Sequence, residues 1–576
     1  MKRTKLPPIF YQSDGEDIWL RELLPSLNPN FQPHILSCGA GFDSLALLIE
    51  YIENPDSRDF PLENLIVVHA VVGGESVETK LLMEQVIFPL CREHNIWFIQ
   101  ACRNGEREKD GITILSSTRQ PTTFYVRGAY SLLTYLVMSG TVPQRNGSSR
   151  LCTLKFKGWV IDTIARYLFG DSPRQRYIGF NADETQRAKS DKSISNREPS
   201  PYYLIGYNAD ETKRLKDKSF GDIQQPYDYE IGFNADEAGR IKESRDRKQV
   251  FRFPLIEMGY GRAWCVSRVN EFANRRTHGR ITQGRKSFCV NGCPFSECNG
   301  KRQRGNNTHG DLRDDWLSEP RYGGEAAFIE HISLAINDQQ PLYTKQLVID
   351  ILKETDNQAA IAHYERLLAG EYWVDLVIPN LQRLVKDPKY LFPASAQKQI
   401  DGLLDDRTWA VYCVRRIFAT DVSMPYRQTQ ILFQGNQTDT LVFLSELAEQ
   451  YEKTPEMVEL SYRFWTIERP QPYWTEVEVQ TKTGKKRTKR IKVVPPRPYV
   501  EEYFVAAPAA VYDKQRITPE LYDLKWLGIT GQLPRIGIND EEATITTSSN
   551  RVKSRSSAAT NRRRISVSSN PGISMS

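Results

Sequence analysis

The chain has no apolar run long enough to cross a bilayer. Its longest runs, such as residues 130–138, fall well short of the roughly 20 residues that a spanning helix needs. No basic-then-apolar leader opens the sequence, so we expect a cytoplasmic protein with no membrane partner. Surplus charge is also scarce, because the formal charge is +6 and residues 543–576 alone hold six Lys/Arg and no Asp or Glu. Overall composition therefore gives no argument for nucleic-acid binding.

Cysteines are few for the length and odd in number, nine in 576 residues, which argues against a disulfide framework and favours metal or redox use. Four occur in apolar contexts, strand-like or helical, and should be buried small hydrophobes: Cys38, Cys91, Cys102 and Cys413. Three fall within ten residues of a segment rich in Gly, Asn and Arg: Cys289, Cys293 and Cys298. Their spacing lets the thiolates converge on one metal centre, although it matches neither the common ferredoxin nor the zinc-ribbon spacing.

Residues 37–44, Ser-Cys-Gly-Ala-Gly-Phe-Asp-Ser, turn a short apolar strand into a helix through a glycine loop. Backbone N–H groups and the positive end of a helix dipole point at a bound anion in such a loop. Gly39 and Gly41 allow close approach of a phosphate, and the hydroxyls of Ser37 and Ser44 can donate further hydrogen bonds. The alternative is a tight turn in which Asp43 caps the helix.

Strands and helices alternate after this loop. Residues 64–72 form an apolar β-branched run, residues 78–94 have a helical period, and residues 96–101 are again strand-like. This alternation predicts a parallel sheet with helices on both faces. The glycine loop would lie at the carboxyl ends of the strands, where ligands of such sheets bind.

Five segments occur in the order typical of one known family. They follow the glycine loop and are Arg150-Leu151-Cys152-Thr153 with Lys157, Ile178 to Glu184 with Arg187, Pro254 to Glu257, Arg262 to Cys265, and Lys286 to Phe295. Together with the loop they resemble the phosphoadenosine phosphosulfate (PAPS) reductase family of the adenine-nucleotide α-hydrolase-like superfamily, over about residues 30 to 300.

The resemblance implies an α/β, doubly wound parallel sheet that binds ATP or PAPS with Mg²⁺. It implies nucleotide contacts from the loop and from Lys157 and Arg262, with Asp43 as the catalytic residue. Position 42, often lysine in the ATP-cleaving members, is Phe42 here, so positive charge must come from elsewhere: Lys157, Arg262 or Lys286.

The same resemblance puts cysteines at 152 and 265 beside the downstream cluster. It implies a [4Fe–4S] cluster held by Cys152, Cys265, Cys289 and Cys293, with Cys298 as a substitute ligand. Two alternatives stay open: a zinc site built from the downstream cysteines with or without His278, and no metal at all.

A repeat interrupts the family pattern, which has one copy of this motif. Ile-Gly-Phe/Tyr-Asn-Ala-Asp-Glu begins at residues 178, 205 and 231. Three near-identical strands cannot share one sheet position, so we expect one working copy and an inserted lobe of charged hairpins within residues 177–245. Which copy works is open, with a preference for the third because it leads into Pro254 and Leu255.

The remaining domains are predicted from composition and period. We expect an N-terminal arm at 1–29, a nucleotide-binding domain at 30–310 with its cysteine cluster at 286–300, a C-terminal, mainly helical domain at 325–470, a basic β-hairpin at 471–500, and a disordered basic tail at 543–576. The hairpin and tail are the candidate contacts for DNA or tRNA. The alternative is a solvated hairpin whose lysines protect its edges.

Three functions remain. The first is ATP-dependent adenylation of an acceptor followed by sulfur transfer, as in tRNA thiolation or DNA phosphorothioation enzymes. The second is reduction of PAPS or adenylylsulfate. Against the first stands the lack of a C-terminal cysteine, since the last one is Cys413, and against the second stands Leu151 where the plant-type pattern has a cysteine next to Cys152. The third is a nucleotide-binding module, without turnover, of a defence or mobile-element complex with protein partners.

Overall fold

The computed structural model divides the chain into two compact units, Met1–Thr408 with Pro508–Val511 and Trp409–Ala507 with Tyr512–Ser576. It describes residues 6–12, 34–143, 145–146, 149–150, 152–169, 175–179, 202–206, 227–230, 249–252, 254–258, 260–281, 293, 312–343, 346–372, 378, 382, 385–386, 397, 400–401, 407–422, 424–480, 486–511, 514–515, 517 and 519–534.

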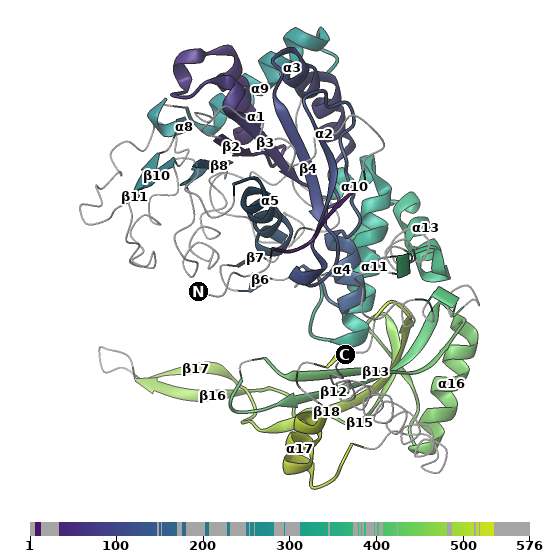
Figure 1. The fold of residues 1–576 in the computed structure, drawn as a ribbon. Coiled ribbons are helices and arrows are strands. Elements are labelled where there is room, and N and C mark those ends of the chain that lie inside the picture. The colour runs from purple at the N-terminus through teal and green to yellow at the C-terminus, as the bar shows by residue number, and fades with distance from the viewer. Residues whose placement is uncertain are drawn as a thin grey trace, which may run out of the picture. The chain divides into compact units, whose positions relative to one another are not determined.

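Unit 1 is built on a seven-stranded sheet in the order β1-β5-β4-β3-β2-β8-β9 (Figure 1). Five of these strands, β4, β3, β2, β8 and β9, run parallel, whereas β5 pairs antiparallel with β4 and carries β1 beside it. The strands are β1 Ile9–Tyr11, β2 His34–Ser37, β3 Leu65–Ala70, β4 Trp97–Arg103, β5 Ile112–Thr118, β8 Gln175–Gly179 and β9 Tyr202–Gly206.

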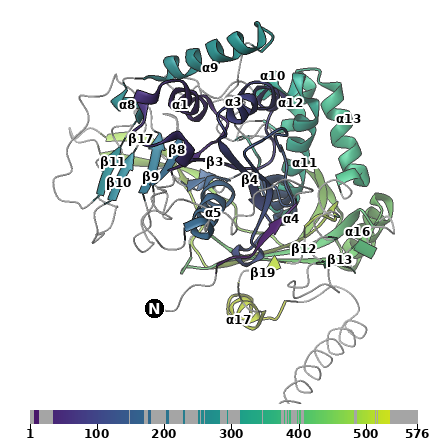
Figure 2. The ribbon, with the colours of Figure 1, turned by 45° about the horizontal axis from the view of Figure 1, so that its top comes forward.

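Helices cover both faces of this sheet (Figure 2). Alternate residues of β3 face opposite ways, so Leu65 and Val67 join one apolar core and Ile66 and Val68 join the other. The first core includes α1 Phe42–Glu53, α3 Phe88–Glu93 and α9 Arg262–Thr277, and the second includes α5 Trp159–Phe169. The mixed α/β architecture with a parallel-rich sheet is therefore confirmed.

The helical segment predicted between residues 78 and 94 is present but interrupted. It consists of α2 Val77–Leu82, a π-helical turn Met83–Ile87 and α3. The other elements of unit 1 are α4 Leu132–Ser139, β6 Arg145–Asn146, β7 Ser149–Arg150, β10 Tyr227–Glu230, β11 Gln249–Arg252, α8 Pro254–Glu257, α10 Leu312–Ser318, α11 Pro320–Ile336, α12 Val348–Glu354 and α13 Gln358–Arg366.

The repeat is arranged differently from our expectation. The first copy, not the third, supplies the strand beside β2, because β8 ends at Ile178 and Gly179 and directly follows α5. The second copy supplies β9, and the third begins just after β10, which pairs with β11 in a separate sheet. Both pairings are parallel, so the expected hairpins are not what the described strands form.

Unit 2 corrects the prediction of a mainly helical domain at 325–470. Helices do extend through α13, but from residue 409 the chain forms a six-stranded sheet in the order β14-β15-β18-β12-β13-β19. Its strands are β12 Trp409–Phe418, β13 Tyr426–Gly435, β14 Glu456–Val458, β15 Ser461–Ile467, β18 Tyr499–Pro508 and β19 Lys514–Gln515, with helices α16 Gln437–Gln450 and α17 Pro519–Thr530.

The misread segment is β12, whose ten residues are all buried. A strand covered on both faces reads as a continuous apolar run, and such a run cannot be told from a buried helix by periodicity. Cys413 consequently lies in a strand, not in the helix expected for it.

The predicted basic hairpin is formed by β16 Tyr473–Gln480 and β17 Lys486–Val493, an antiparallel pair separate from the large sheet. The arm at 1–29 and the tail at 543–576 lie outside the described residues, apart from residues 6–12. Among the described helices, none combines the length and the apolar character that crossing a membrane requires.

Candidate functional site

The glycine loop leaves the carboxyl end of β2, a strand hydrogen-bonded on both sides by β3 and β8. Ala40 takes a left-handed conformation with φ of 53°, and α1 begins at Phe42 after Gly41. The strand, loop and helix thus match the sequence prediction. Gly41 is the N-cap of α1, so the alternative in which Asp43 caps the helix is wrong.

Two helices follow neighbouring strands of the sheet, α1 after β2 and α2 after β3, and they begin differently. At the start of α2 the Ser76 hydroxyl accepts a hydrogen bond from the Thr79 amide, 3.1 Å away. At the start of α1 the N-cap residue is Gly41, and among the described residues no side-chain cap is seen there. A helix start without a side-chain cap keeps backbone donors and the positive end of the dipole for another acceptor, and an anion is the acceptor that this geometry favours.

Lys157 brings a positive charge to the loop. A Cβ placed on Gly39 would lie 3.9 Å from the Lys157 ammonium nitrogen, so this ammonium group lies beside the glycine in the direction that a side chain would take. Lys157 belongs to the π-helical turn Cys152–Gly158 that precedes α5. The structure therefore unites two elements more than 110 residues apart, as the sequence prediction for this lysine requires.

Arg103, the last residue of β4, fixes the turn that carries Lys157. Its buried guanidinium donates to the carbonyl oxygens of Gly105, Glu106 and Lys155, the last at 3.1 Å. It also lies over the ring of Trp159, 4.5 Å from the centroid. Three carbonyl oxygens and an aromatic ring satisfy this buried cation. Because Lys155 lies in the turn of Lys157 and Trp159 directly follows that turn, these two contacts hold the turn at the end of β4.

His69 supports the loop from β3. Its Nδ1 lies 2.8 Å from the Cys38 carbonyl oxygen, and its ring packs on Phe124. Burial, together with the nearby Lys157 charge, lowers the pKa of His69 to about 4, although the hydrogen bond to the Cys38 carbonyl acts in the opposite direction. The neutral ring must then carry its proton on Nδ1 to donate to that carbonyl, which leaves Nε2 as a buried acceptor with no hydrogen-bond partner among the residues that the structure describes.

Other loop side chains are occupied within the loop. The Ser44 hydroxyl donates to the Gly41 carbonyl oxygen at 3.0 Å. We had expected this hydroxyl to donate to the ligand, and in this structure its proton is already used. Asp43 is buried in the first turn of α1, and Ser37 is buried at the end of β2. Burial also raises the pKa of the Cys38 thiol to about 11, which excludes it as a nucleophile at neutral pH.

A second glycine loop follows β3, and the sequence analysis missed it. Gly73 and Gly74 both have positive φ, 95° and 76°, and the buried Glu75 comes next. The Tyr322 hydroxyl of α11 donates to the Glu75 carbonyl oxygen at 2.7 Å. Two consecutive glycines directly after an apolar run were the signal that could have identified this loop.

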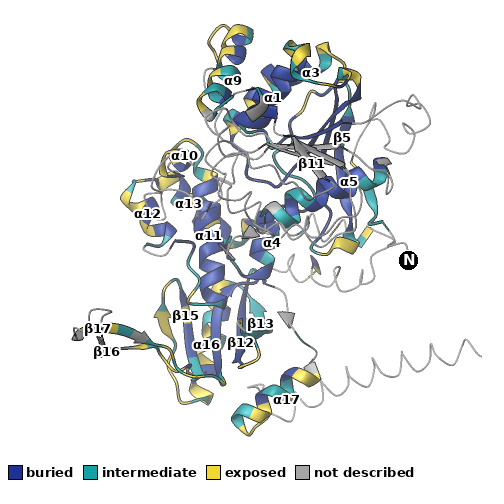
Figure 3. Cartoon of the chain, turned by 90° about the vertical axis from the view of Figure 1, so that its left-hand side faces the viewer, coloured by how far each residue is buried: buried dark blue, intermediate teal, exposed yellow. Residues whose placement is uncertain are grey.

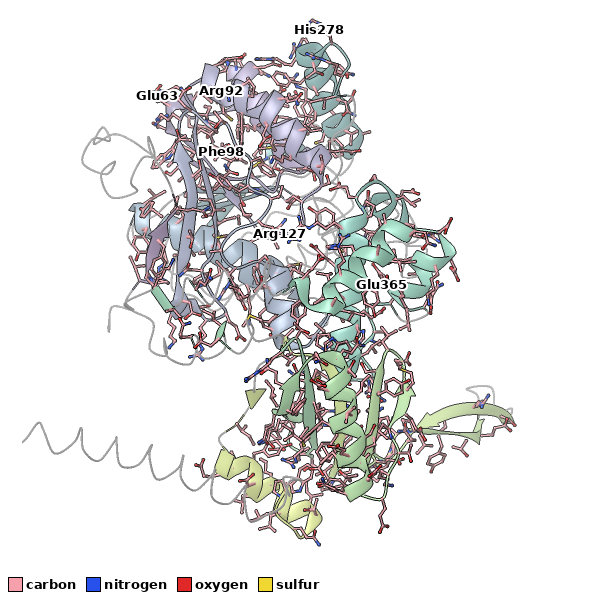
Figure 4. The ribbon with its side chains drawn as sticks, turned by 90° about the vertical axis from the view of Figure 1, so that its right-hand side faces the viewer. Glu63, Arg92, Phe98, Arg127, His278 and Glu365 are labelled. Carbon is pink, nitrogen blue, oxygen red and sulfur yellow. The ribbon has the colours of Figure 1, made fainter. Side chains whose placement is uncertain are left out.

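Arg127 lies next to that second loop, and Figure 4 shows it between the sheet and the helices that follow residue 312. Its guanidinium is paired with Glu325, a carboxylate of α11 that is 3% exposed and also accepts from Arg321 at 2.9 Å. This ion pair attaches Arg127 to α11.

Arg262 is the first residue of α9, and its side chain lies outside the described part of the chain. The helix itself contacts the far half of α1, where Arg268 pairs with Glu50 at 2.9 Å and Glu53 at 2.7 Å. These contacts are two turns or more beyond the loop. The ion pairs therefore do not support the prediction that α9 contributes to the nucleotide site.

The predicted metal ligands are only partly described. Cys265 is buried in the apolar core between α1 and α9, Cys293 is buried, and Cys152 is half-buried at the start of its turn. Cys289 and Cys298 lie outside the described residues. Among the residues that are described, no three His, Cys, Asp or Glu side chains lie close enough together to hold a metal.

The described site thus offers a cation, a helix start without a side-chain cap and a glycine loop braced by a neutral histidine, an arrangement suited to holding a phosphate. It contains no activated thiol among the described cysteines of the loop. No family model, curated protein or solved structure matches the chain.

Proposed function

We propose that the chain binds the phosphates of an adenine nucleotide at the loop of residues 37–44. The observation that carries this proposal is the Lys157 ammonium beside Gly39 at the start of α1, which has no side-chain cap. Position 42 is Phe42, so the loop itself lacks the lysine that the ATP-cleaving enzymes it resembles often have at this position. Lys157 provides the compensating charge from another element.

The resemblance to PAPS reductases extends this proposal to chemistry and fold. In this proposal, unit 1 is a doubly wound, adenine-nucleotide α-hydrolase-like domain. An acceptor oxygen attacks the α-phosphate of ATP and releases pyrophosphate, and the sulfur of a sulfide-level donor then displaces AMP from the acceptor. Asp43 would help to hold a Mg²⁺ ion that would offset charge on the phosphates. A module that binds nucleotide without turnover would have the same loop. Measuring pyrophosphate release from ATP distinguishes the enzyme, which releases it, from the module, which does not.

Reduction of PAPS is the weaker candidate. That chemistry needs a nucleophilic thiolate, and Cys413, the last cysteine, is fully buried in β12. Burial raises the pKa of its thiol to about 12, so it is protonated and shielded at neutral pH.

An iron–sulfur cluster held by Cys152, Cys265, Cys289 and Cys293, or a zinc ion, is a proposal from sequence. The described cysteines do not assemble it, since Cys265 is packed among apolar side chains. Anaerobic purification with iron, zinc and sulfide analysis tests it, with the Cys289→Ala/Cys293→Ala variant as the comparison. Broad absorbance at about 400 nm that the variant loses supports the cluster, and metal-free protein removes it.

The nucleotide proposal is tested by measuring ATP and PAPS affinity of the full chain and of Lys157→Ala. A charge-assisted hydrogen bond is worth about 1.5–3 kcal/mol, so affinity should fall about tenfold to a hundredfold. Lys155→Ala is the matched control, because its ammonium lies 4.9 Å from the centroid of the Tyr135 ring and is held there. Equal losses in both variants, or no nucleotide binding by the parent protein, would refute the assignment of the site.

A further inference from the structure

The hairpin of β16 and β17 belongs to a strongly basic segment. Residues 473–493 contain seven Lys/Arg and two Glu. The two strands pair only with each other and extend away from the six-stranded sheet of their own unit (Figures 1 and 3). Residues 481–485, which join them, lie outside the described part.

The register of the hairpin sorts its residues onto two faces, because directly opposed residues in an antiparallel pair share a face. One face holds Tyr473 with Val493, Thr475 with Ile491, Val477 with Lys489, and Val479 with Arg487. The other holds Trp474 with Lys492, Glu476 with Arg490, Glu478 with Thr488, and Gln480 with Lys486. Both glutamates are on the second face, so we call the first the acid-free face.

This sorting argues against the lysines serving only to protect an edge. Protective charges prevent edge-to-edge pairing whichever face they occupy. Here Glu476 stands directly opposite Arg490 on the mixed face and offsets its charge. Arg487 and Lys489, on the acid-free face, stand opposite valines. The result is one face that is cationic toward the tip and apolar toward the base, where Tyr473 is 59% exposed.

We propose that the acid-free face of this hairpin binds duplex DNA, with Arg487 and Lys489 at phosphates. A two-stranded β-ribbon has the width that the DNA major groove admits, whereas the major groove of duplex RNA is too narrow for it. Single strands are bound mainly by stacking on several aromatic rings, and the acid-free face has only Tyr473. This inference does not depend on nucleotide binding in unit 1.

The test measures binding of the full-length chain to a labelled DNA duplex across a salt series. Two variants remove one Arg and one Lys each: Arg487→Gln/Lys489→Gln on the acid-free face and Lys486→Gln/Arg490→Gln on the mixed face. They have identical composition and charge, so any difference between them reports the face. Each phosphate contact contributes about 0.9 to the slope of log K against log salt, so the first variant should lose about 2 and the second far less.

Three results would overturn the proposal. The parent chain shows no salt-dependent DNA binding, the two variants lose affinity equally, or a matched RNA duplex or single strand binds more tightly than the DNA duplex. An intact hairpin in each variant is checked by hydrogen exchange in peptides from residues 473–493. Glutamine introduces no like-charge repulsion across the strands, so the exchange should match that of the parent.

Discussion

Two buried groups, His69 and Glu330, should make the stability of unit 1 depend on pH in opposite directions. Replacing one of them should leave the pH dependence caused by the other. His69 is fully buried, and its pKa is lowered from 6.5 to about 4. Glu330 of α11 is 0% exposed, and burial raises its pKa from 4.5 to about 7, although its carboxylate accepts hydrogen bonds from the amides of Leu342 and Val348. The nearby Asp350 charge contributes to this rise in pKa.

The signs follow from which state binds the proton. Between pH 6.5 and 4 the unfolded chain protonates His69 while the folded chain does not, so stability falls as pH falls. Between pH 4.5 and 7 the folded chain keeps the Glu330 proton while the unfolded chain loses it, so stability falls as pH rises. Each shift of 2.5 units corresponds to about 3 kcal/mol, and the two slopes oppose each other between pH 4.5 and 6.5.

The perturbation is His69→Asn, in which the Asn amide replaces Nδ1–H as donor to the Cys38 carbonyl oxygen and cannot titrate. Compared with the parent, this variant should be least destabilised near pH 4 and lose up to about 3 kcal/mol of relative stability by pH 6.5. Glu330→Gln should show the reverse trend up to pH 7. Comparing each variant with the parent cancels the contributions of all unchanged carboxylates.

The assay is native-state hydrogen exchange of peptides from β3 and α11, corrected for the intrinsic pH dependence of exchange. It reports unit 1 separately from unit 2, which a whole-chain melt does not. A parent-minus-variant difference that stays constant from pH 4.5 to 6.5 for His69→Asn would show that His69 titrates normally. The neutral-ring description of the loop would then be wrong.

Three further outcomes are expected. Gly111→Ala should destabilise unit 1 by more than Gly279→Ala, although both glycines have φ near 80°. A Cβ at position 111 would lie 2.0 Å from the Pro8 carbonyl oxygen, whereas a Cβ at position 279 would meet nothing within 4 Å. Thermal melts of the two variants measure the difference. Arg268→Ala should lower the free energy of unfolding by about 2 kcal/mol and Arg275→Ala by less than about 1 kcal/mol. Arg268 is 17% exposed and bonded to two carboxylates, whereas Arg275 is 60% exposed and bonded to one. Urea unfolding measures both losses. Asp43→Asn should keep or tighten Mg²⁺-free ATP binding and abolish Mg²⁺-dependent pyrophosphate release, and release that survives would exclude the role proposed for this carboxylate.

The glycine loop was predictable because its signals are local. Two glycines between an apolar strand and an apolar helix specify a strand-to-helix turn from a few consecutive residues. The approach of Lys157 to Gly39 is a long-range contact, and only the resemblance to a family suggested it. His69 had no signal at all, because one histidine in an apolar strand is the same pattern whether it braces a loop or simply fills the core.

The errors arose where burial removed the periodic pattern. Strand β12 carries Arg415 and Arg416 within an apolar run, and both are buried and ion-paired, with Glu502 and Glu501. Each charge is compensated by a strand 80 or more residues away, so nothing near β12 indicates a sheet. Sequence-based interpretation takes a charged residue as a sign of solvent exposure. The rule fails for a charge that is buried because a residue distant in sequence neutralises it.

The same reasoning separates the two candidate binding regions of the chain. In unit 1 the cation beside the loop is half-buried and belongs to a turn that Arg103 holds through the Lys155 carbonyl oxygen, so a ligand there meets groups already in place. Preorganised charge of this kind favours a small anion of fixed geometry. On the hairpin, Arg487 and Lys489 follow one another along one face of a two-stranded ribbon, which suits an extended polyanion whose affinity depends on salt. The contrast predicts that added salt weakens DNA binding by the hairpin much more steeply than nucleotide binding by the loop, so one salt series on the same preparation distinguishes the two sites.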